Sequence, residues 1–226
     1  IEAAAALVAD PSHATWVKQH WGDDYLQREN LFYRMLLISG LTSYQKLLGD
    51  DAYEPLLRDQ VESLAAEIDA SPYGLLDDYP GQCYPTDVLA AIAAIRRADA
   101  VLGTDHTAFA ERAVRGFEGD RIDERTGLPD WLANPDTGQG VGGARGVGIA
   151  FMLVWAPELW PETAQQWYES TEVHFWQQEG LVAGFRERPR GHVWGEWFVD
   201  VDAGPVMAGY GTAASAFGIA AARANG

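Results

Sequence analysis

The sequence has little positive charge and no long apolar run. Of its 226 residues, 33 are acidic and 16 are Lys or Arg, which gives a formal net charge of −17. This balance argues against charge-driven binding to nucleic acid or to an anionic membrane surface, because both need basic patches. No stretch reaches the roughly 20 uninterrupted apolar residues of a transmembrane helix. With 47% apolar residues, the chain can still form one large core.

Cysteine is equally scarce. The single cysteine, Cys83, excludes an internal disulfide and leaves the redox compartment open. The five histidines show no metal-ligand spacing and no phosphate-binding P-loop is present, so we expect no metal and no cofactor. The first residue is Ile1 rather than Met, so a signal or anchor was removed or the chain is part of a longer protein. The compartment stays open, with an extracytoplasmic or membrane-associated location among the alternatives.

What the sequence does contain is an alternation of two kinds of helical segment. Segments that are apolar almost all round are Glu29–Leu48, Thr86–Leu102, Gly146–Trp155 and Pro205–Ala222. Segments with one apolar face are Asp51–Ala70, Thr107–Phe117 and Thr163–Trp176. Enclosed helices are apolar all round, whereas surface helices have one apolar stripe. The alternation therefore predicts inner helices ringed by outer ones.

We accordingly predict an all-α fold, an α/α toroid of the six-hairpin-barrel type, as a single domain over residues 1–226. The inner helices should start near Asn30, Thr86, Gly146 and Pro205. About four inner and three outer helices are fewer than a closed ring needs, so the toroid in this chain is incomplete. A ring of this kind has a central pocket for a small ligand.

Two stretches interrupt the helices and predict short β-hairpins in the loops. Asp120–Gly143 is rich in turn residues and should form a hairpin around Asn134–Gly138. Gly180–Asp202 contains two expected strands, Leu181–Phe185 and His192–Val199.

The candidate chemical groups cluster just before the second enclosed helix. Cys83 precedes Pro85, at a helix start whose free N–H groups favour an anion and could activate the thiol. Asp77 and Asp78 act against a thiolate, but a pair of carboxyls can serve as proton donor and acceptor. A buried apolar cysteine beside a solvated aspartate turn is the alternative interpretation. We take Cys83, Asp77 and Asp78 as the candidate catalytic residues.

Other side chains could bind a ligand in the expected pocket. Arg145 opens an enclosed segment and could bind a carboxylate or phosphate, although pairing with one of the many acids is the favoured interpretation. His192 and Trp194 border an expected strand and could reach the pocket. The candidate ligand-binding residues are Tyr33, Tyr84, Arg145, His192 and Trp194.

Three sequence features resemble the bacterial linalool dehydratase/isomerase family. Arg28–Arg34, RENLFYR, resembles the basic-Glu-Asn-x-x-Tyr-basic start of an inner helix in that family. The turn Ser71–Gly74 followed by Gln82-Cys83 resembles the family's turn and second catalytic cysteine. Gly127–Gly138 resembles its hairpin at the same length, and the resemblance spans roughly residues 20 to 222.

The resemblance implies an α/α-barrel fold with an inner pocket. It also implies acid–base loss of water and allylic isomerisation of a terpene alcohol, without metal or organic cofactor. Of the family's catalytic residues, only Cys83 carries over. The family's first cysteine corresponds to a position near Asp77, its histidine to Leu36 and a tyrosine to a position near Val147.

Three functions remain open from the sequence. The first is a cofactor-free hydro-lyase or isomerase on a small apolar or amphiphilic alcohol, with Asp77 or Asp78 exchanging the proton beside Cys83. The second is a non-catalytic domain that binds a ligand or a protein, as the soluble part of a larger envelope or membrane protein. The third is a glycosidase-like α/α barrel, for which no acid and nucleophile at a defined separation can be assigned. We expect a small-molecule partner and no nucleic acid, and we leave a homo-oligomer or larger assembly open.

Overall fold

The computed structural model describes residues 2–192 and 196–226. The chain divides into two compact units. The N-terminal unit comprises the described residues up to Gly116 together with Asn134–Gly138. The C-terminal unit comprises Phe117–Ala133 and the described residues from Gln139 to Gly226.

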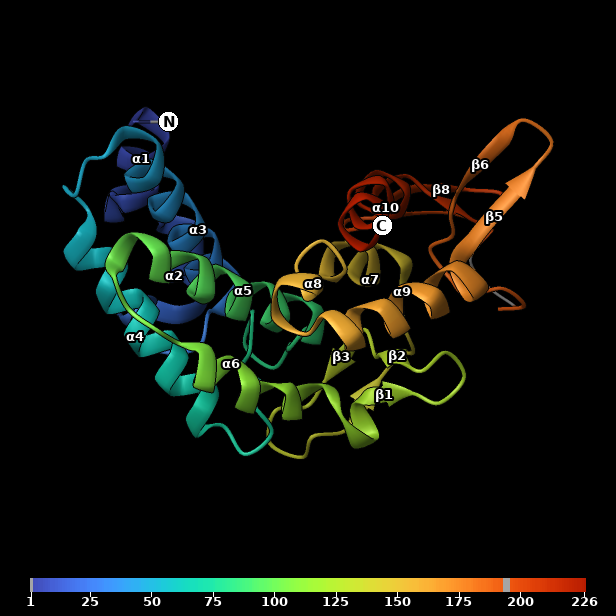
Figure 1. Ribbon diagram of the computed structural model, residues 1–226, viewed down its shortest axis with the longest axis horizontal. Coiled ribbons are helices and arrows are strands. Elements are labelled where there is room, and N and C mark those ends of the chain that lie inside the picture. Colours follow the sequence, from blue (N-terminus) through green and yellow to red (C-terminus); the bar gives the residue numbers. More distant parts are fainter. Residues whose placement is uncertain (1, 193–195) are drawn as a thin grey trace. The chain divides into compact units, whose positions relative to one another are not determined.

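The N-terminal unit is helical. Its helices are α1 (Glu2–Ala9), α2 (Thr15–Trp21), α3 (Leu31–Leu48), α4 (Glu54–Ala70), α5 (Pro85–Leu102) and α6 (Thr107–Ala113), with short 3₁₀ helices at Pro11–His13 and Gly22–Asp24. A further 3₁₀ helix, Val114–Phe117, ends at the first residue of the C-terminal unit. Figure 1 shows α3, α4 and α5 in this unit, where each packs against the other two.

Helix α5 forms the centre of this packing. Thirteen of its 18 residues are buried, because Ala and Ile residues face neighbours on nearly every side. Gly49 and Gly103 end α3 and α5 in the left-handed conformation, which glycine adopts at little cost. In α3, Leu36 is 49% exposed, so the expectation of apolar burial on all sides is wrong for this helix.

The C-terminal unit mixes helices and small antiparallel sheets. Its helices are α7 (Gly146–Met152), α8 (Ala156–Leu159), α9 (Pro161–Phe175) and α10 (Thr212–Asn225), with a 3₁₀ helix at Gly119–Arg121. Its strands are β1 (Ile122–Asp123), β2 (Leu128–Pro129), β3 (Leu132–Ala133), β4 (Gly140–Val141), β5 (Trp176–Glu179), β6 (Val182–Phe185), β7 (Trp197–Asp200), β8 (Gly204–Met207) and β9 (Tyr210–Gly211).

The strands pair locally. The pairs β1–β2, β3–β4 and β5–β6 are two-stranded, and β7–β8–β9 form a three-stranded sheet. The β3–β4 pair confirms the hairpin expected around Asn134–Gly138, where the Asn134 side chain accepts the Asp136 and Thr137 N–H groups. Helix α10, drawn in red in Figure 1, packs on α7, β6 and α9.

The prediction of an all-α toroid is therefore wrong. The fold is mixed, with 58% of the described residues in helices and 14% in strands. The main error lies at Pro205–Ala222, where the first residues form β8 and β9 and helix α10 begins at Thr212. Gly204 and Gly209 have positive φ angles and reverse the chain, so β8 pairs with β7 instead of starting a helix. Of the residues of α10, Ala214, Gly218 and Ala221 are buried, so α10 is not an enclosed helix.

Candidate functional site

The chain reaches α3 through two consecutive non-glycine residues in the left-handed region. Glu29 has φ 44° and Asn30 has φ 51°. This conformation costs an L-residue about 1–2 kcal/mol, so surrounding contacts must hold it. The buried Asn30 side chain donates to the Tyr25 carbonyl at 2.7 Å. The Asn30 side chain thus ties the Glu29–Asn30 turn to the segment that precedes it.

An ion pair between a buried arginine and a partly exposed glutamate holds the other side of this turn. Arg34 is fully buried, and its Nη1 donates to Glu67 Oε1 at 2.9 Å and to the Glu29 carbonyl at 3.3 Å. Glu67 Oε2 accepts the Glu29 N–H at 2.7 Å. The remaining guanidinium donors reach Gln60 and Ser63 of α4. The Arg34–Glu67 pair therefore fixes the direction in which α3 starts.

The start of α3 lies directly against Asp77. The Leu31 N–H donates to the Asp77 carbonyl at 3.1 Å. The Asp77 carboxylate accepts the Gly81 N–H on Oδ2 at 2.6 Å, while its buried Oδ1 has no hydrogen-bond partner. Burial raises the pKa of this carboxyl, and the Gly81 N–H opposes the rise. Burial and the Asp77 charge also raise the pKa of Glu29, which places a third carboxyl in this cluster.

Asp78 lies deeper and connects the starts of two helices. Its Oδ2 accepts the Tyr84 N–H at 2.9 Å just before α5, and the Phe32 N–H of α3 also hydrogen-bonds its carboxylate. Its Oδ1 is buried without a partner. Burial, with the charge of Asp87, raises the pKa of Asp78 well above its usual range. Burial thus disfavours the ionised form of this carboxyl.

Cys83 joins this cluster as a protonated thiol. It is 1% exposed. Burial raises its pKa well above the usual value, and the charges of Asp78 and Asp77 add to the rise. The structure thus brings Cys83 near both aspartates, but it does not activate the thiol. A thiolate nucleophile is therefore disfavoured at Cys83.

Two of the expected ligand-binding residues lie in the same unit. Tyr33 is half-buried in an aromatic group, with ring centroids 6.0 Å from Trp16 and 5.8 Å from Tyr25. The Tyr84 hydroxyl donates to Gln82 Oε1 at 3.2 Å. In the sequence, Tyr33 comes directly after Phe32, whose N–H interacts with Asp78, and Tyr84 comes directly after Cys83.

The other three expected ligand-binding residues belong to the C-terminal unit. Arg145 is buried, with its Nε 2.6 Å from Glu187 Oε1 and its Nη2 3.1 Å from Asp200, so it pairs with acids as the favoured interpretation expects. Its guanidinium also covers the Trp131 ring at 4.3 Å. It is therefore not available to bind a ligand. His192 is half-buried, and Trp194 lies outside the described residues.

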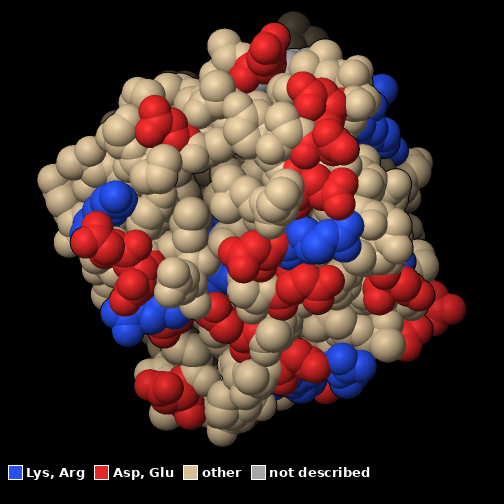
Figure 2. Space-filling model, turned by 90° about the vertical axis from the view of Figure 1, so that its left-hand side faces the viewer, with Lys and Arg blue, Asp and Glu red and all other residues tan. Residues whose placement is uncertain are grey.

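The surface of the molecule agrees with its acidic composition. On the face shown in Figure 2, Asp and Glu side chains are more widespread than Lys and Arg. Within the described part of the chain, no group of three or more His, Cys, Asp or Glu side chains is placed to hold a metal ion. None of the described helices is long and apolar enough to cross a membrane.

No protein-family model matches the chain, and no curated protein matches it. The family resemblance is therefore untested by these comparisons. Interpretation of the site depends on its own geometry. That geometry defines a class of site, namely a buried group of carboxyls and one thiol where two helices start.

Proposed function

We propose that Asp77, Asp78 and Cys83 form an acid–base site that removes water from, or shifts a double bond in, a small uncharged alcohol with an apolar body. The observation that carries this proposal is the pair of adjacent buried carboxyls, each with one oxygen that lacks a partner. Buried polar atoms normally find partners, so each exception needs an explanation, and a catalytic role is one.

The different surroundings of the two carboxyls support separate roles. Asp78 is 2% exposed with a pKa well above its usual range, so it holds a proton. Asp77 is 8% exposed and is nearer to solvent. Neighbouring carboxyls with different environments are a recurrent arrangement of an acid and a base. The strained Glu29–Asn30 turn beside them fits the same interpretation, because backbone strain is frequent at functional sites.

The reaction can be written with these residues alone. The protonated Asp78 gives its proton to the substrate hydroxyl, the C–O bond breaks and water leaves. The Asp77 carboxylate then takes a proton from the carbon next to the cation, which forms the alkene. Transfer of that proton from Asp77 to Asp78 restores the starting state. Cys83 packs beside the pair. The sequence resemblance favours a tertiary or allylic alcohol as the substrate class.

Turnover of linalool, geraniol and shorter tertiary alkenols tests the proposal. We expect Asp77→Asn and Cys83→Ala each to lower turnover without unfolding the protein, with a loss on the order of 100- to 10,000-fold for a proton-transfer group such as Asp77. Asp51→Asn is the matched control: it removes the same charge at an exposed position beyond the far end of α3, about 27 Å away along the helix.

The result of this assay decides the proposal. Equal turnover by Asp77→Asn and the wild-type protein would refute the assigned base. Failure of the wild-type chain to convert any of the alcohols would refute the activity. Turnover that is lost on adding a chelator would contradict a mechanism carried by these side chains alone.

A further inference from the structure

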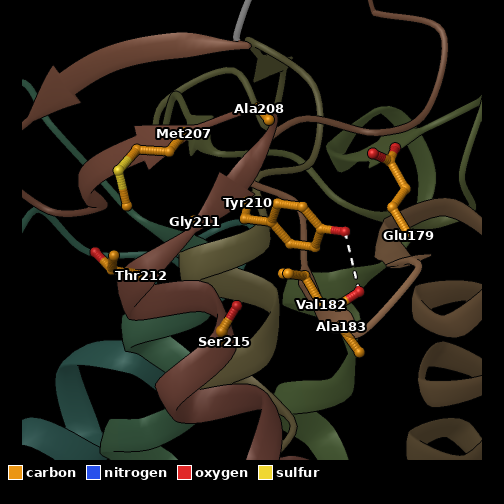
Figure 3. Close-up of a pocket in the computed structure, with 9 residues that line it drawn as sticks. All are labelled: Glu179, Val182, Ala183, Met207, Ala208, Tyr210, Gly211, Thr212 and Ser215. Carbon is orange, nitrogen blue, oxygen red and sulfur yellow. Dashed lines mark hydrogen bonds between the residues drawn. The ribbon is translucent and has the colours of Figure 1, made fainter.

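A groove in the C-terminal unit lies far along the sequence from the acid–base cluster. It has a volume of about 600 Å³ and opens beside the start of α10. Figure 3 shows its walls, which come from the end of β5, from β6, from the turn between β8 and β9, and from the first turn of α10. Its lining residues are Glu179, Val182, Ala183, Met207, Ala208, Tyr210, Gly211, Thr212 and Ser215.

The polar side chains of this groove are mostly occupied by the fold itself. The Tyr210 hydroxyl donates to the Val182 carbonyl at 3.3 Å, the contact drawn in Figure 3. Ser215 Oγ accepts the Phe185 N–H at 3.0 Å, and Thr212 donates to the Ala203 carbonyl at 3.1 Å. The groove therefore offers a ligand mainly apolar and aromatic surface. Val182 and Met207 remain 57% and 51% exposed.

Glu179 is the one charged residue among those that line the groove. Its Oε1 accepts a hydrogen bond from Gln177 Nε2 at 3.0 Å, and it forms no ion pair with any described residue. In Figure 3, its carboxylate and the Tyr210 hydroxyl are on the same side of the groove, across from Met207 and Thr212. A negative charge thus borders an aromatic ring and an apolar wall.

We propose that this groove binds a small organic cation with an apolar body, such as an alkyl- or aryl-substituted ammonium ion. The Glu179 carboxylate complements the charge. The face of an aromatic ring such as Tyr210 attracts an ammonium group within about 6 Å. Val182 and the Met207 thioether cover the apolar part, and Met side chains adapt to ligands of varied shape. An anionic ligand is disfavoured by Glu179 and by the net charge of −17.

The three methionines make a direct test possible. Met35 and Met152 are buried at 2% and 0% exposure, so among ¹³C-methyl methionine signals only that of Met207 reports on the groove. We expect benzyltrimethylammonium, added at constant ionic strength, to shift the Met207 signal saturably and to leave Met35 and Met152 unchanged. Choline and its neutral isostere 3,3-dimethylbutan-1-ol then separate the contribution of the charge from that of shape.

Variants of the full chain assign the contacts. Glu179→Gln should weaken binding about fivefold, and Tyr210→Leu should weaken it similarly by removing the ring. Tyr210→Phe keeps the ring and should retain binding. Glu162→Gln, an equal change of charge at an exposed position of α9 outside the groove, is the matched control.

Two outcomes would overturn the proposal. One is a Met207 signal that does not respond saturably to benzyltrimethylammonium. The other is equal affinity for choline and its neutral isostere, together with no effect of Glu179→Gln, which would show a purely apolar groove. Neither outcome depends on catalysis by the Asp77–Asp78–Cys83 cluster, so this proposal and the proposed function can fail separately.

Discussion

At the residue scale, Asp78 shows how a functional arrangement can oppose stability. A carboxyl that is buried with one oxygen unpartnered costs folding free energy whenever it is ionised. Burial favours the protonated form, which avoids this cost, and it raises the pKa of Asp78 well above the usual range in the folded chain. An aspartate that stays solvated on folding keeps its usual pKa and does not change how stability depends on pH. The change in that dependence when Asp78 is replaced therefore measures the effect of burying its carboxyl.

We therefore predict that Asp78→Asn stabilises the protein at neutral pH. Between the pKa of an unfolded aspartate, about 4, and the raised pKa of folded Asp78, the folded state binds more protons than the unfolded state. Its contribution to stability is thus present below about pH 4 and is lost as the pH rises. Asparagine has no charge to desolvate, so the variant should gain about 1–3 kcal/mol at pH 7 and nothing below pH 4.

Urea unfolding of both proteins between pH 3.5 and 8 measures this difference. A variant that is less stable than the wild type at every pH would show that Asp78 is ionised in the folded protein and acts through its hydrogen bonds to Tyr84 and Phe32.

At the element scale, the Arg34–Glu67 pair connects α3 to α4 and orients the N–H groups at the start of α3 toward the Asp77–Asp78 segment. Through the Glu29–Asn30 turn, it brings the Leu31 N–H to the Asp77 carbonyl. Breaking a buried ion pair leaves an uncompensated charge, which is far more costly than losing an exposed one. Helix α4 contains both kinds, since Glu54 pairs with Arg58 on the surface.

We predict that Glu67→Gln lowers the free energy of unfolding by about 3 kcal/mol, while Glu54→Gln lowers it by less than about 1 kcal/mol. Both variants remove one acid of α4 that contacts an arginine, so their difference isolates the effect of burying Arg34. Thermal and urea unfolding at pH 7 provide the comparison. Equal losses in the two variants would mean that water solvates Arg34 in the folded protein.

The sequence predicts elements well where burial follows helical spacing. The segments around α4 and α9 are predicted from apolar residues that repeat at the helical period, and those around α3 and α5 from being apolar almost all round. It fails at Pro205–Met207, since the strand there depends on pairing with β7, and no local pattern reveals that partner. The toroid prediction depended on that segment being an enclosed helix.

Part of the candidate site can likewise be predicted from the sequence, and part cannot. Cys83, Asp77 and Asp78 lie within seven residues, so their proximity follows from the sequence. Arg34 and Glu67 are 33 residues apart, and their contact could not be predicted. A signal was nevertheless present: Arg34 is a charged residue within a strongly apolar helical segment, and a charge in such a position needs a buried partner.

At the scale of the whole molecule, charge is the dominant property. The chain carries a net charge of −17 in 226 residues, and its acidic side chains are spread over the face shown in Figure 2. Such a charge repels itself more strongly in the compact state than in the unfolded state, where the same groups are farther apart. Salt weakens this repulsion because the screening length falls from about 30 Å at 0.01 M to about 10 Å at 0.1 M.

We predict that added NaCl raises the midpoint of thermal unfolding at pH 7.5, with most of the gain below about 0.3 M. Salt also weakens exposed ion pairs such as Glu54–Arg58, but each of these contributes little. The buried Arg145–Glu187 pair and the half-buried Arg34–Glu67 pair are screened less. The weakening of the repulsion between acidic groups should therefore outweigh the weakening of the ion pairs, and the midpoint should rise. Calorimetry in NaCl, with sucrose as a non-ionic control, measures the midpoint of thermal unfolding. The variant Lys46→Glu makes the net charge more negative at an exposed position, so its midpoint should rise more with salt. A midpoint that falls with salt would mean that exposed ion pairs, rather than net repulsion, dominate the electrostatic stability of this chain.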